Sequence, residues 1–278
     1  MPIGNDLVDL TRQENLARGS NPRLHQRVLA PSEQQTLAES PVPELIYLAL
    51  WSAKEAVFKL LKQTEEDLLF SHRRFVVQPM IKWGQCTFPE KGGPERGGPD
   101  KLGQVNFPGE NSELAELRGV FEGQVQYAEK QIPVIWQYHD RWLHCIATEK
   151  ASDVYRSEVA LLSDWLLKDD FTPAEEISIY SDASRAVRHL VKAMVDQVAV
   201  TSSNSVLELP QNQTRSLSSS LNDQLELLRF PAGRRYSPPR LYFGGEPLDE
   251  LEVSLSHDGE WVAAVIGRST SPGCVPKS

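Results

Sequence analysis

The sequence predicts an α+β protein, a pseudo-dimer of two similar halves at residues 1–150 and 151–278, each an antiparallel sheet packed with a long helix. Three observations support this prediction. Residues 134–147 and 251–267 both have the form of a β-hairpin around a His-Asp pair. Each hairpin is preceded by a segment whose apolar residues recur at helical spacing. A unit that occurs twice indicates a duplication, which changes the expected number of domains.

The composition is that of a globular protein. With 278 residues and 40% hydrophobic residues, the chain can form one large domain or two small ones, each with its own core. The formal net charge of -9 excludes a general nucleic-acid binder, which needs a basic face. Because no apolar run reaches the length of a membrane span and the start has no basic region followed by an apolar stretch, we expect a cytoplasmic protein. Three widely spaced cysteines predict plain thiols.

The N-terminal elements follow from local patterns. Residues 3–10 form a short apolar run that contains Asp6, and we interpret it as a buried strand. Residues 11–37 predict a broken helix. The clearest helix spans residues 43–62, where Glu55 and Lys59 belong to a polar stripe beside the apolar one. Since Glu55 and Lys59 are one turn apart, we expect them on the same helix face.

The remaining segments alternate between strands and one insertion. Residues 73–83 alternate enough to predict a strand, whereas residues 92–104 are rich in Gly and Pro and predict a mobile surface insertion. Strand patterns return from residue 122, with a turn near Asp140-Arg141. The second hairpin has its turn at Asp258-Gly259, a pair that favours the positive φ angles of a tight turn.

The duplication can be tested by the offsets between the copies. His139-Asp140 maps onto His257-Asp258 at an offset of 118 residues, with a second turn one residue longer. The helical segment at residues 54–61 resembles residues 184–191 at an offset of 130. The two offsets differ by 12, about the length of the Gly/Pro-rich insertion, so we expect one duplication plus one insertion. Because each half then keeps only part of the polar residues, a single site at the interface of the halves is expected.

Three short polar signatures, far apart in sequence, carry the candidate chemistry. They are Gly4-Asn5-Asp6 near the start, Lys54-Glu55 with Lys59 in the long helix, and Ser256-His257-Asp258 near the end. Together they supply two carboxylates, two lysines and a histidine, a set suited to holding a divalent metal against a diphosphate. Residue by residue, other interpretations stay open. Asp6 is compatible with a surface acid, and Glu55 with Lys59 is compatible with a helical ion pair of about 0.3–0.5 kcal/mol.

The signatures resemble one family. In this order, Gly-x-Asp-x-Val, Trp-x-x-Lys-Glu-Ala-x-x-Lys and Ser-x-Ser-His-Asp resemble the 4'-phosphopantetheinyl transferase superfamily, whose enzymes load carrier proteins with the arm of coenzyme A. The motifs and the segment at residues 27–33 are similar to the short holo-acyl-carrier-protein synthase type, whereas the length and duplication are similar to the longer, monomeric pseudo-dimer type. The resemblance spans most of the chain, although strong motifs cover only three short stretches.

The resemblance implies an enzyme that transfers 4'-phosphopantetheine to a serine of an acyl or peptidyl carrier protein in fatty acid or polyketide biosynthesis. It implies Mg²⁺ bound by Asp6 and Glu55, coenzyme A as co-substrate, and a monomer that contains the internal pseudo-dimer. The implied catalytic residues are Asp6, Glu55 and Lys59. The residues implied to contact coenzyme A are Lys59, Ser256, His257 and Arg240. Glu55 or a metal-bound water would deprotonate the incoming serine.

Several assignments stay open. Lys54 points away from Glu55 on the helix and could equally pack its aliphatic stem or pair with an acid. The arginines at positions 23, 27, 73 and 74 are candidates for docking an acidic carrier, and Arg234 and Arg235 could meet a phosphate or an acidic partner or lie in a solvated loop. A zinc site at His139, His144 and Cys145 is disfavoured because adjacent strand residues such as His144 and Cys145 point to opposite faces.

Two departures from the family pattern leave room for other functions. Gly245-Glu246-Pro247 stands where relatives read Gly-Lys-Pro, and Asn5 replaces an apolar residue before Asp6. One alternative is a non-catalytic descendant that binds coenzyme A or serves as a scaffold. The other is a different metal-dependent phosphotransferase, although no glycine-rich phosphate loop supports it.

Overall fold

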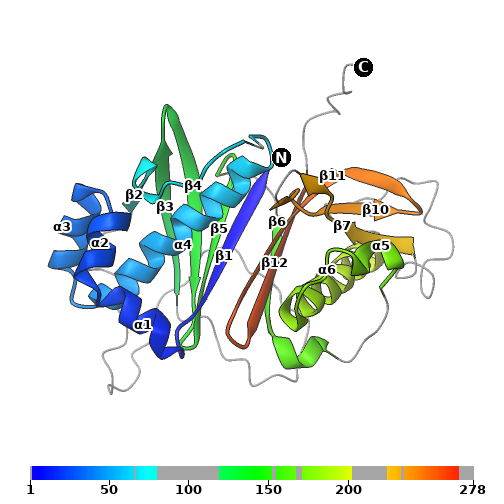
Figure 1. Cartoon of the computed structure of the whole chain (residues 1–278), viewed down its shortest axis with the longest axis horizontal. Helices are drawn as coiled ribbons and strands as arrows, with labels where there is room; N and C mark the ends of the chain where they lie inside the picture. The colour runs from blue at the N-terminus through cyan, green and yellow to red at the C-terminus, as the bar shows by residue number, and fades with distance from the viewer. Residues whose placement is uncertain are drawn as a thin grey trace.

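The computed structural model describes residues 2–65, 67–79, 119–151, 155–166, 171–201, 224–232 and 235–268. These residues form two five-stranded antiparallel sheets, each crossed by one 20-residue helix (Figure 1). The α+β class with antiparallel sheets is therefore confirmed. The predicted insertion at residues 92–104, two of the cysteines (Cys86 and Cys274) and Arg234 lie outside the described residues.

The first sheet has the strand order β1-β5-β4-β3-β2. Its strands are β1 (Ile3–Asp9), β2 (Phe75–Pro79), β3 (Gly119–Tyr127), β4 (Lys130–Tyr138) and β5 (Trp142–Thr148). The predicted strand at residues 3–10 thus becomes an edge strand, paired on one side only with β5. Its residues are buried except Asp6, which is partly accessible.

Helices cover one face of this sheet. They are α1 (Gln13–Gly19), α2 (Pro22–Val28), α3 (Pro31–Glu39) and α4 (Pro43–Lys62), followed by a short 3₁₀ turn, η1 (His72–Arg74). The broken helix predicted over residues 11–37 is therefore three short helices, two of which begin at a proline, as expected from its preference for the first turn. The apolar stripe of α4 packs into the core with Phe75 and Trp136, whose indole N–H donates to the Ala49 carbonyl at 2.9 Å.

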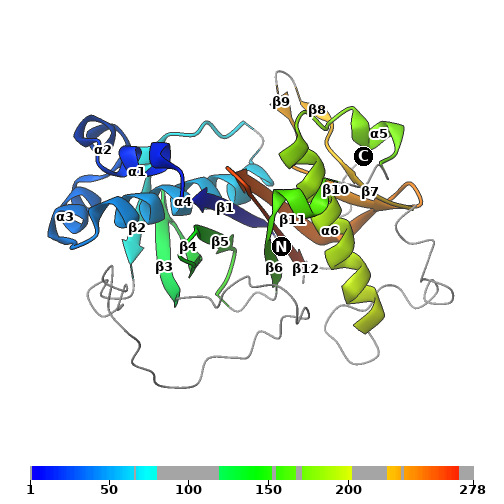
Figure 2. The same ribbon diagram turned by 90° about the horizontal axis from the view of Figure 1, so that it is seen from below.

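The second sheet repeats this arrangement, in the order β6-β12-β11-β10-β7. Its strands are β6 (Tyr155–Leu161), β7 (Leu225–Leu228), β10 (Arg240–Phe243), β11 (Glu246–Asp258) and β12 (Trp261–Arg268). The other elements are a 3₁₀ turn η2 (Leu162–Trp165), the helices α5 (Pro173–Glu176) and α6 (Asp182–Thr201), and a small ribbon of β8 (Pro231–Ala232) and β9 (Arg235–Tyr236). Helix α6 crosses the second sheet as α4 crosses the first (Figure 2).

The register of the hairpins corrects one expected offset. The backbone N–H of His139 donates to the Trp142 carbonyl at 2.9 Å, and Asp258 faces Trp261 at the end of the second hairpin. Each turn therefore encloses two residues, and the hairpins correspond at an offset of 119 rather than 118. In this register Tyr138, not His139, takes the place of His257.

A buried Lys-Glu pair corrects the helix offset. Lys54 of α4 pairs with Glu33 at 2.7 Å, and Lys192 of α6 pairs with Glu175 at 2.9 Å. Glu33 also accepts from the backbone of β2, and Glu175 accepts from the backbone of β7. The helices therefore correspond at an offset of 138, because residues 54–61 lie late in α4 whereas residues 184–191 lie early in α6.

The two sheets meet along β1. This edge strand has backbone N–H groups that face away from β5, and an unpaired edge is costly when buried. Side chains of β11 accept these N–H groups in order: Ser254 Oγ accepts from Asn5 at 2.9 Å, Ser256 Oγ from Leu7 at 3.0 Å, and Asp258 Oδ2 from Asp9 at 2.9 Å. The ends of the described chain are thus held side by side.

Candidate functional site

The approach of α4 to β1 depends on Gly4. A Cβ atom at this position would lie 1.9 Å from the Ala56 carbonyl oxygen and 2.7 Å from the Leu60 backbone nitrogen. Only glycine allows the helix to lie this close to the strand. Ala56 is flanked on the helix by Glu55, and Lys59 follows one turn later, so this contact brings both side chains to the strand residue Asp6. The Gly-x-Asp pattern thus has a packing cause.

Lys59 joins the N-terminal signatures to the C-terminal one. Its ammonium donates to Asp6 Oδ1 at 2.9 Å, to the Asn5 carbonyl at 2.9 Å and to Ser256 Oγ at 3.3 Å. The Ser256 hydroxyl donates to Asp6 Oδ1 at 3.4 Å and accepts from the Leu7 backbone. Three of the residues singled out from the sequence therefore share one hydrogen-bonded group, built from β1, α4 and β11.

The charge of Lys59 lowers the pKa of both Asp6 and Glu55, but burial outweighs it. Burial raises the pKa of Asp6 above its ordinary value, although Lys59 acts in the opposite direction. Burial and the charge of Asp6 together raise the pKa of Glu55 to about 7. The pKa of His257 is lowered by desolvation and by Lys59, so its imidazole is favoured in the neutral form. A further cation beside Asp6 and Glu55 would relieve the unfavourable carboxylate pair.

The pair of acids fits a magnesium ion. Mg²⁺ prefers carboxylate oxygens and commonly takes only one or two from a protein, with water and substrate phosphate as its other ligands. Asp6 and Glu55 provide two such groups, each partly accessible to solvent. Across the described residues there is no group of three or more His, Cys, Asp or Glu side chains suited to a metal. This chain could therefore bind Mg²⁺ through Asp6 and Glu55 but offers no all-protein cage.

Two cavities meet at this group. The larger, of about 570 Å³, lies between α4, α6 and β11, and the smaller, of about 160 Å³, lies between α1, α4 and the end of β11. Asp6 and His257 line both. The larger cavity is cationic, because Lys59, Lys62, Arg188 and Arg229 line it together with the neutral His257. The smaller contains the carboxyl group of Glu55.

Arg188 is a cavity residue that the sequence reasoning missed. Only 1% of its surface is exposed, and its guanidinium donates to four uncharged oxygens of Ser178 and Ser184, at 2.6–3.1 Å. Its Nε is buried without a hydrogen-bond partner among the described residues. Desolvation and the nearby Arg229 lower its pKa to about 10. The available signal was an arginine among the apolar positions of α6, since arginine is almost never fully buried unless it is paired.

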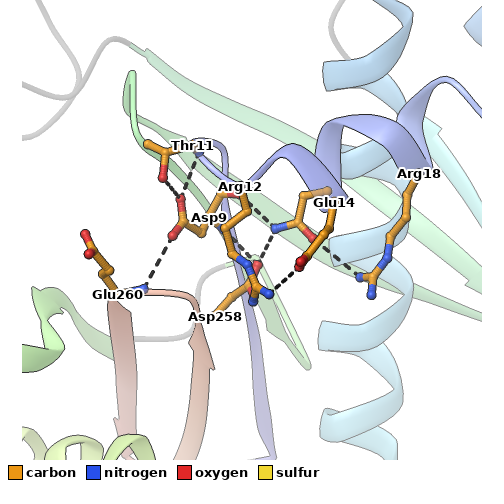
Figure 3. Close-up of polar contacts among 8 residues, drawn as sticks. Asp9, Thr11, Arg12, Glu14, Arg18, Asp258 and Glu260 are labelled. Carbon is orange, nitrogen blue, oxygen red and sulfur yellow. Dashed lines mark hydrogen bonds and ion pairs between the residues drawn. The ribbon is translucent and has the colours of Figure 1, made fainter.

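Asp258 belongs to the third signature but had no role assigned from the sequence, and it ties α1 to the site (Figure 3). Its Oδ1 accepts from Arg12 at 3.0 Å, and its Oδ2 accepts from the Asp9 backbone and from Asn15 Nδ2 at 2.5 Å. Asn15 also donates to the Asp9 carbonyl at 2.8 Å and accepts from Arg18 at 3.4 Å. The C-terminal hairpin thus orients α1 over the smaller cavity.

Other candidates lie away from the cavities. Arg240 is exposed on β10, in register with Glu252, and lines neither cavity. Lys54 is fully buried against Glu33, which supports the interpretation that it pairs with an acid. His144 and Cys145 are both buried, and Cys145 is a free thiol.

The candidate docking arginines gather on one side of the first half. Arg23 and Arg27 are exposed on α2, and Arg73 and Arg74 are exposed on the neighbouring turn η1. The side chain of Arg235 lies outside the described residues. These four arginines form one basic surface, separate from the cationic lining of the larger cavity.

A family model matches the part of the chain that carries Asp6, Glu55 and Lys59. Residues 2–87 match the model of the 4'-phosphopantetheinyl transferase superfamily, which confirms the resemblance seen in the motifs. No curated protein matches the chain. Among the described residues no helix is long and apolar enough to span a membrane.

Proposed function

We propose that this protein transfers the 4'-phosphopantetheine arm of coenzyme A to a serine of an acyl or peptidyl carrier protein, at a site between its two halves. One observation carries the proposal. Asp6 and Lys59, from the segment that matches the superfamily, share hydrogen bonds with Ser256 from the other end of the chain, at the point where a cationic and an acidic cavity meet. A diphosphate donor and a serine acceptor could approach this point from opposite sides.

The larger cavity suits coenzyme A as the donor. Its volume of about 570 Å³ is within the range of small-molecule sites, and its basic lining is complementary to the phosphates of the ligand. Arg188 is the best-placed of these groups, because its buried guanidinium lacks a carboxylate partner among the described residues. We assign to Arg188 and Arg229 the phosphate contact that the family resemblance had suggested for Arg240.

The carboxyl groups of Asp6 and Glu55 suit the side of the site from which the acceptor serine would approach. When bound by Asp6 and Glu55, Mg²⁺ would supply positive charge to the diphosphate. The serine oxygen forms a bond to the attacked phosphorus, the bond to the adenosine 3',5'-bisphosphate leaving group breaks, and Glu55 takes the serine proton. Without a metal the pKa of Glu55 is raised to about 7, but an ion held by Glu55 would lower this pKa, so Glu55 takes the proton on a carboxylate oxygen that does not hold the ion. Lys59 and His257 face the charge that develops on the phosphates.

The two halves support a duplicated origin. Their strand orders match position by position, and each half holds its long helix by a buried Lys-Glu pair. At the helix offset of 138, Ala193 stands in the place of Glu55, so the second half lacks the acid needed for a second site. We infer a monomer made of halves 1–150 and 151–278, with one active site.

Transfer can be tested by mass spectrometry. Purified protein with coenzyme A and Mg²⁺ should add one phosphopantetheine mass to an apo carrier protein. Asp6→Asn and Glu55→Gln should abolish the gain, whereas Glu39→Gln, on the exposed face of α3, should not. No gain across a panel of acyl and peptidyl carriers would refute the proposal. Calorimetric binding of coenzyme A without Mg²⁺ and without transfer would instead indicate a non-catalytic binding protein.

A further inference from the structure

Tyr47 is a buried tyrosine that the proposed reaction does not yet use. It lies on α4, is fully buried, and lines the smaller cavity together with Glu55. Its hydroxyl has no hydrogen-bond partner among the described residues. Tyr47, Trp51 and Glu55 follow at intervals of four residues and therefore occupy one face of the helix.

An unpaired buried hydroxyl is unusual. Leaving such a group without a partner costs about 1–3 kcal/mol, and most buried polar atoms have one. The ring cannot easily turn toward a new partner, since His25 packs at a centroid distance of 4.9 Å and Trp51 at 6.3 Å. Trp136, in the same hydrophobic core, shows the usual outcome, because its buried N–H donates to the Ala49 carbonyl. Tyr47 is therefore held with its ring fixed beside the smaller cavity that it lines.

The neighbour of the hydroxyl is a hydrogen-bond donor. Arg18 lines the same cavity, and its charge acts on the Tyr47 hydroxyl. Arg18 is exposed and donates to Asn15 Oδ1 at 3.4 Å, with no carboxylate partner among the described residues. Burial raises the pKa of Tyr47, so the hydroxyl keeps its proton. Two groups that can donate hydrogen bonds at one cavity favour an oxygen acceptor, either a carbonyl or a carboxylate.

We propose that Tyr47 and Arg18 donate hydrogen bonds to one oxygen of the acceptor protein, on the segment that presents its serine to Glu55. This inference rests on the proposed function. Tyr47 and Glu55 are eight residues apart, which places their Cα atoms about 12 Å apart along the helix. The oxygen therefore belongs to a residue several positions from the serine, and Tyr47 determines how the acceptor segment lies rather than the chemistry itself.

The test compares Tyr47→Phe with wild-type protein in transfer to an apo carrier. The variant keeps the packed ring and loses only the hydroxyl. We expect kcat/KM for the carrier to fall by about fivefold to tenfold, mainly through KM, with KM for coenzyme A unchanged. Tyr155→Phe, a partly buried tyrosine on β6 that lines neither cavity, is the matched control and should leave both values unchanged.

Two further measurements make the outcome decisive. If Tyr47 and Arg18 hold the same oxygen, Arg18→Ala combined with Tyr47→Phe should lose less than the product of the single losses. Thermal unfolding without substrate should give Tyr47→Phe an unchanged or higher midpoint, because no protein hydrogen bond is lost. A wild-type KM for the carrier, or a midpoint lower by several degrees, would overturn the inference. If the wild-type protein modifies no carrier, the proposed function fails. The unfolding midpoint of Tyr47→Phe then still shows whether the hydroxyl contributes to folding stability.

Discussion

Replacing Gly4 by alanine should separate the two elements that build the site. The added Cβ would lie 1.9 Å from the Ala56 carbonyl oxygen, whereas such contacts essentially never fall below 3.0 Å. The obstructing atom belongs to the buried backbone of α4 and cannot rotate away. The helix must therefore move from β1 by about 1 Å, and Glu55 and Lys59 must move with it.

The expected losses follow from this displacement. Overpacking of this kind costs about 1–3 kcal/mol, which for a chain of this size lowers the unfolding midpoint by roughly 3–10 °C. A shift of about 1 Å between groups that act together costs about 100-fold in rate. The 2.9 Å bond from Lys59 to Asp6 should lengthen beyond hydrogen-bond distance. Activity should therefore fall much more than stability.

Thermal unfolding and transfer to an apo carrier should be measured on the same preparation. Gly245→Ala is the stability control, because its Cβ meets nothing within 4 Å and its φ of +85° adds only backbone strain of about 1 kcal/mol. Wild-type stability and wild-type transfer by the Gly4→Ala protein would refute the argument that this glycine sets the distance between α4 and β1.

Three other changes test separate parts of the structure. In EDTA, the free energy of unfolding of Glu55→Gln should exceed that of wild type by up to about 3 kcal/mol at pH 8 and equal it near pH 4. The reason is that the pKa of Glu55 is raised to about 7 in the folded protein, so wild type loses stability as the pH rises from 4.5 through 7. Urea unfolding at both pH values measures this, and a difference independent of pH would contradict it. Lys54→Met leaves the buried Glu33 unpaired and should cost about 3–5 kcal/mol in urea unfolding, with part of the loss recovered by adding Glu33→Gln; additive losses would argue against a coupled pair. Arg188→Met should weaken coenzyme A binding by about tenfold in calorimetry without changing KM for the carrier, and unchanged binding would remove Arg188 from the proposed phosphate contact.

Local patterns were sufficient for several features. Helical spacing identified α4 at its observed bounds, and the Asp-Gly pair located the turn after β11 to within one residue, since the turn encloses Gly259 and Glu260. Glu55 and Lys59 share a helix face because four residues make about one turn. The comparison of residues 54–61 with 184–191 relied on similar apolar spacing alone. It gave an offset of 130 between the two long helices, whereas the structure gives 138. Buried polar contacts such as Lys54 with Glu33 and Lys192 with Glu175 identify the correspondence, and sequence spacing does not reveal them.

By itself, the sequence determined the α+β class, the superfamily of residues 2–87 and the identity of the acids and lysine that accompany β1 and α4. Each of these depends on residues close together in the chain. Only the tertiary structure showed which residues of the C-terminal half contact these acids and this lysine. The contacts of Lys59 with Ser256 and of Asp9 with Asp258 join residues nearly 200 or 250 positions apart. The unsatisfied backbone edge of β1 is the physical reason, because its N–H groups find acceptors in the β11 side chains, and that pairing brings both cavities to Asp6.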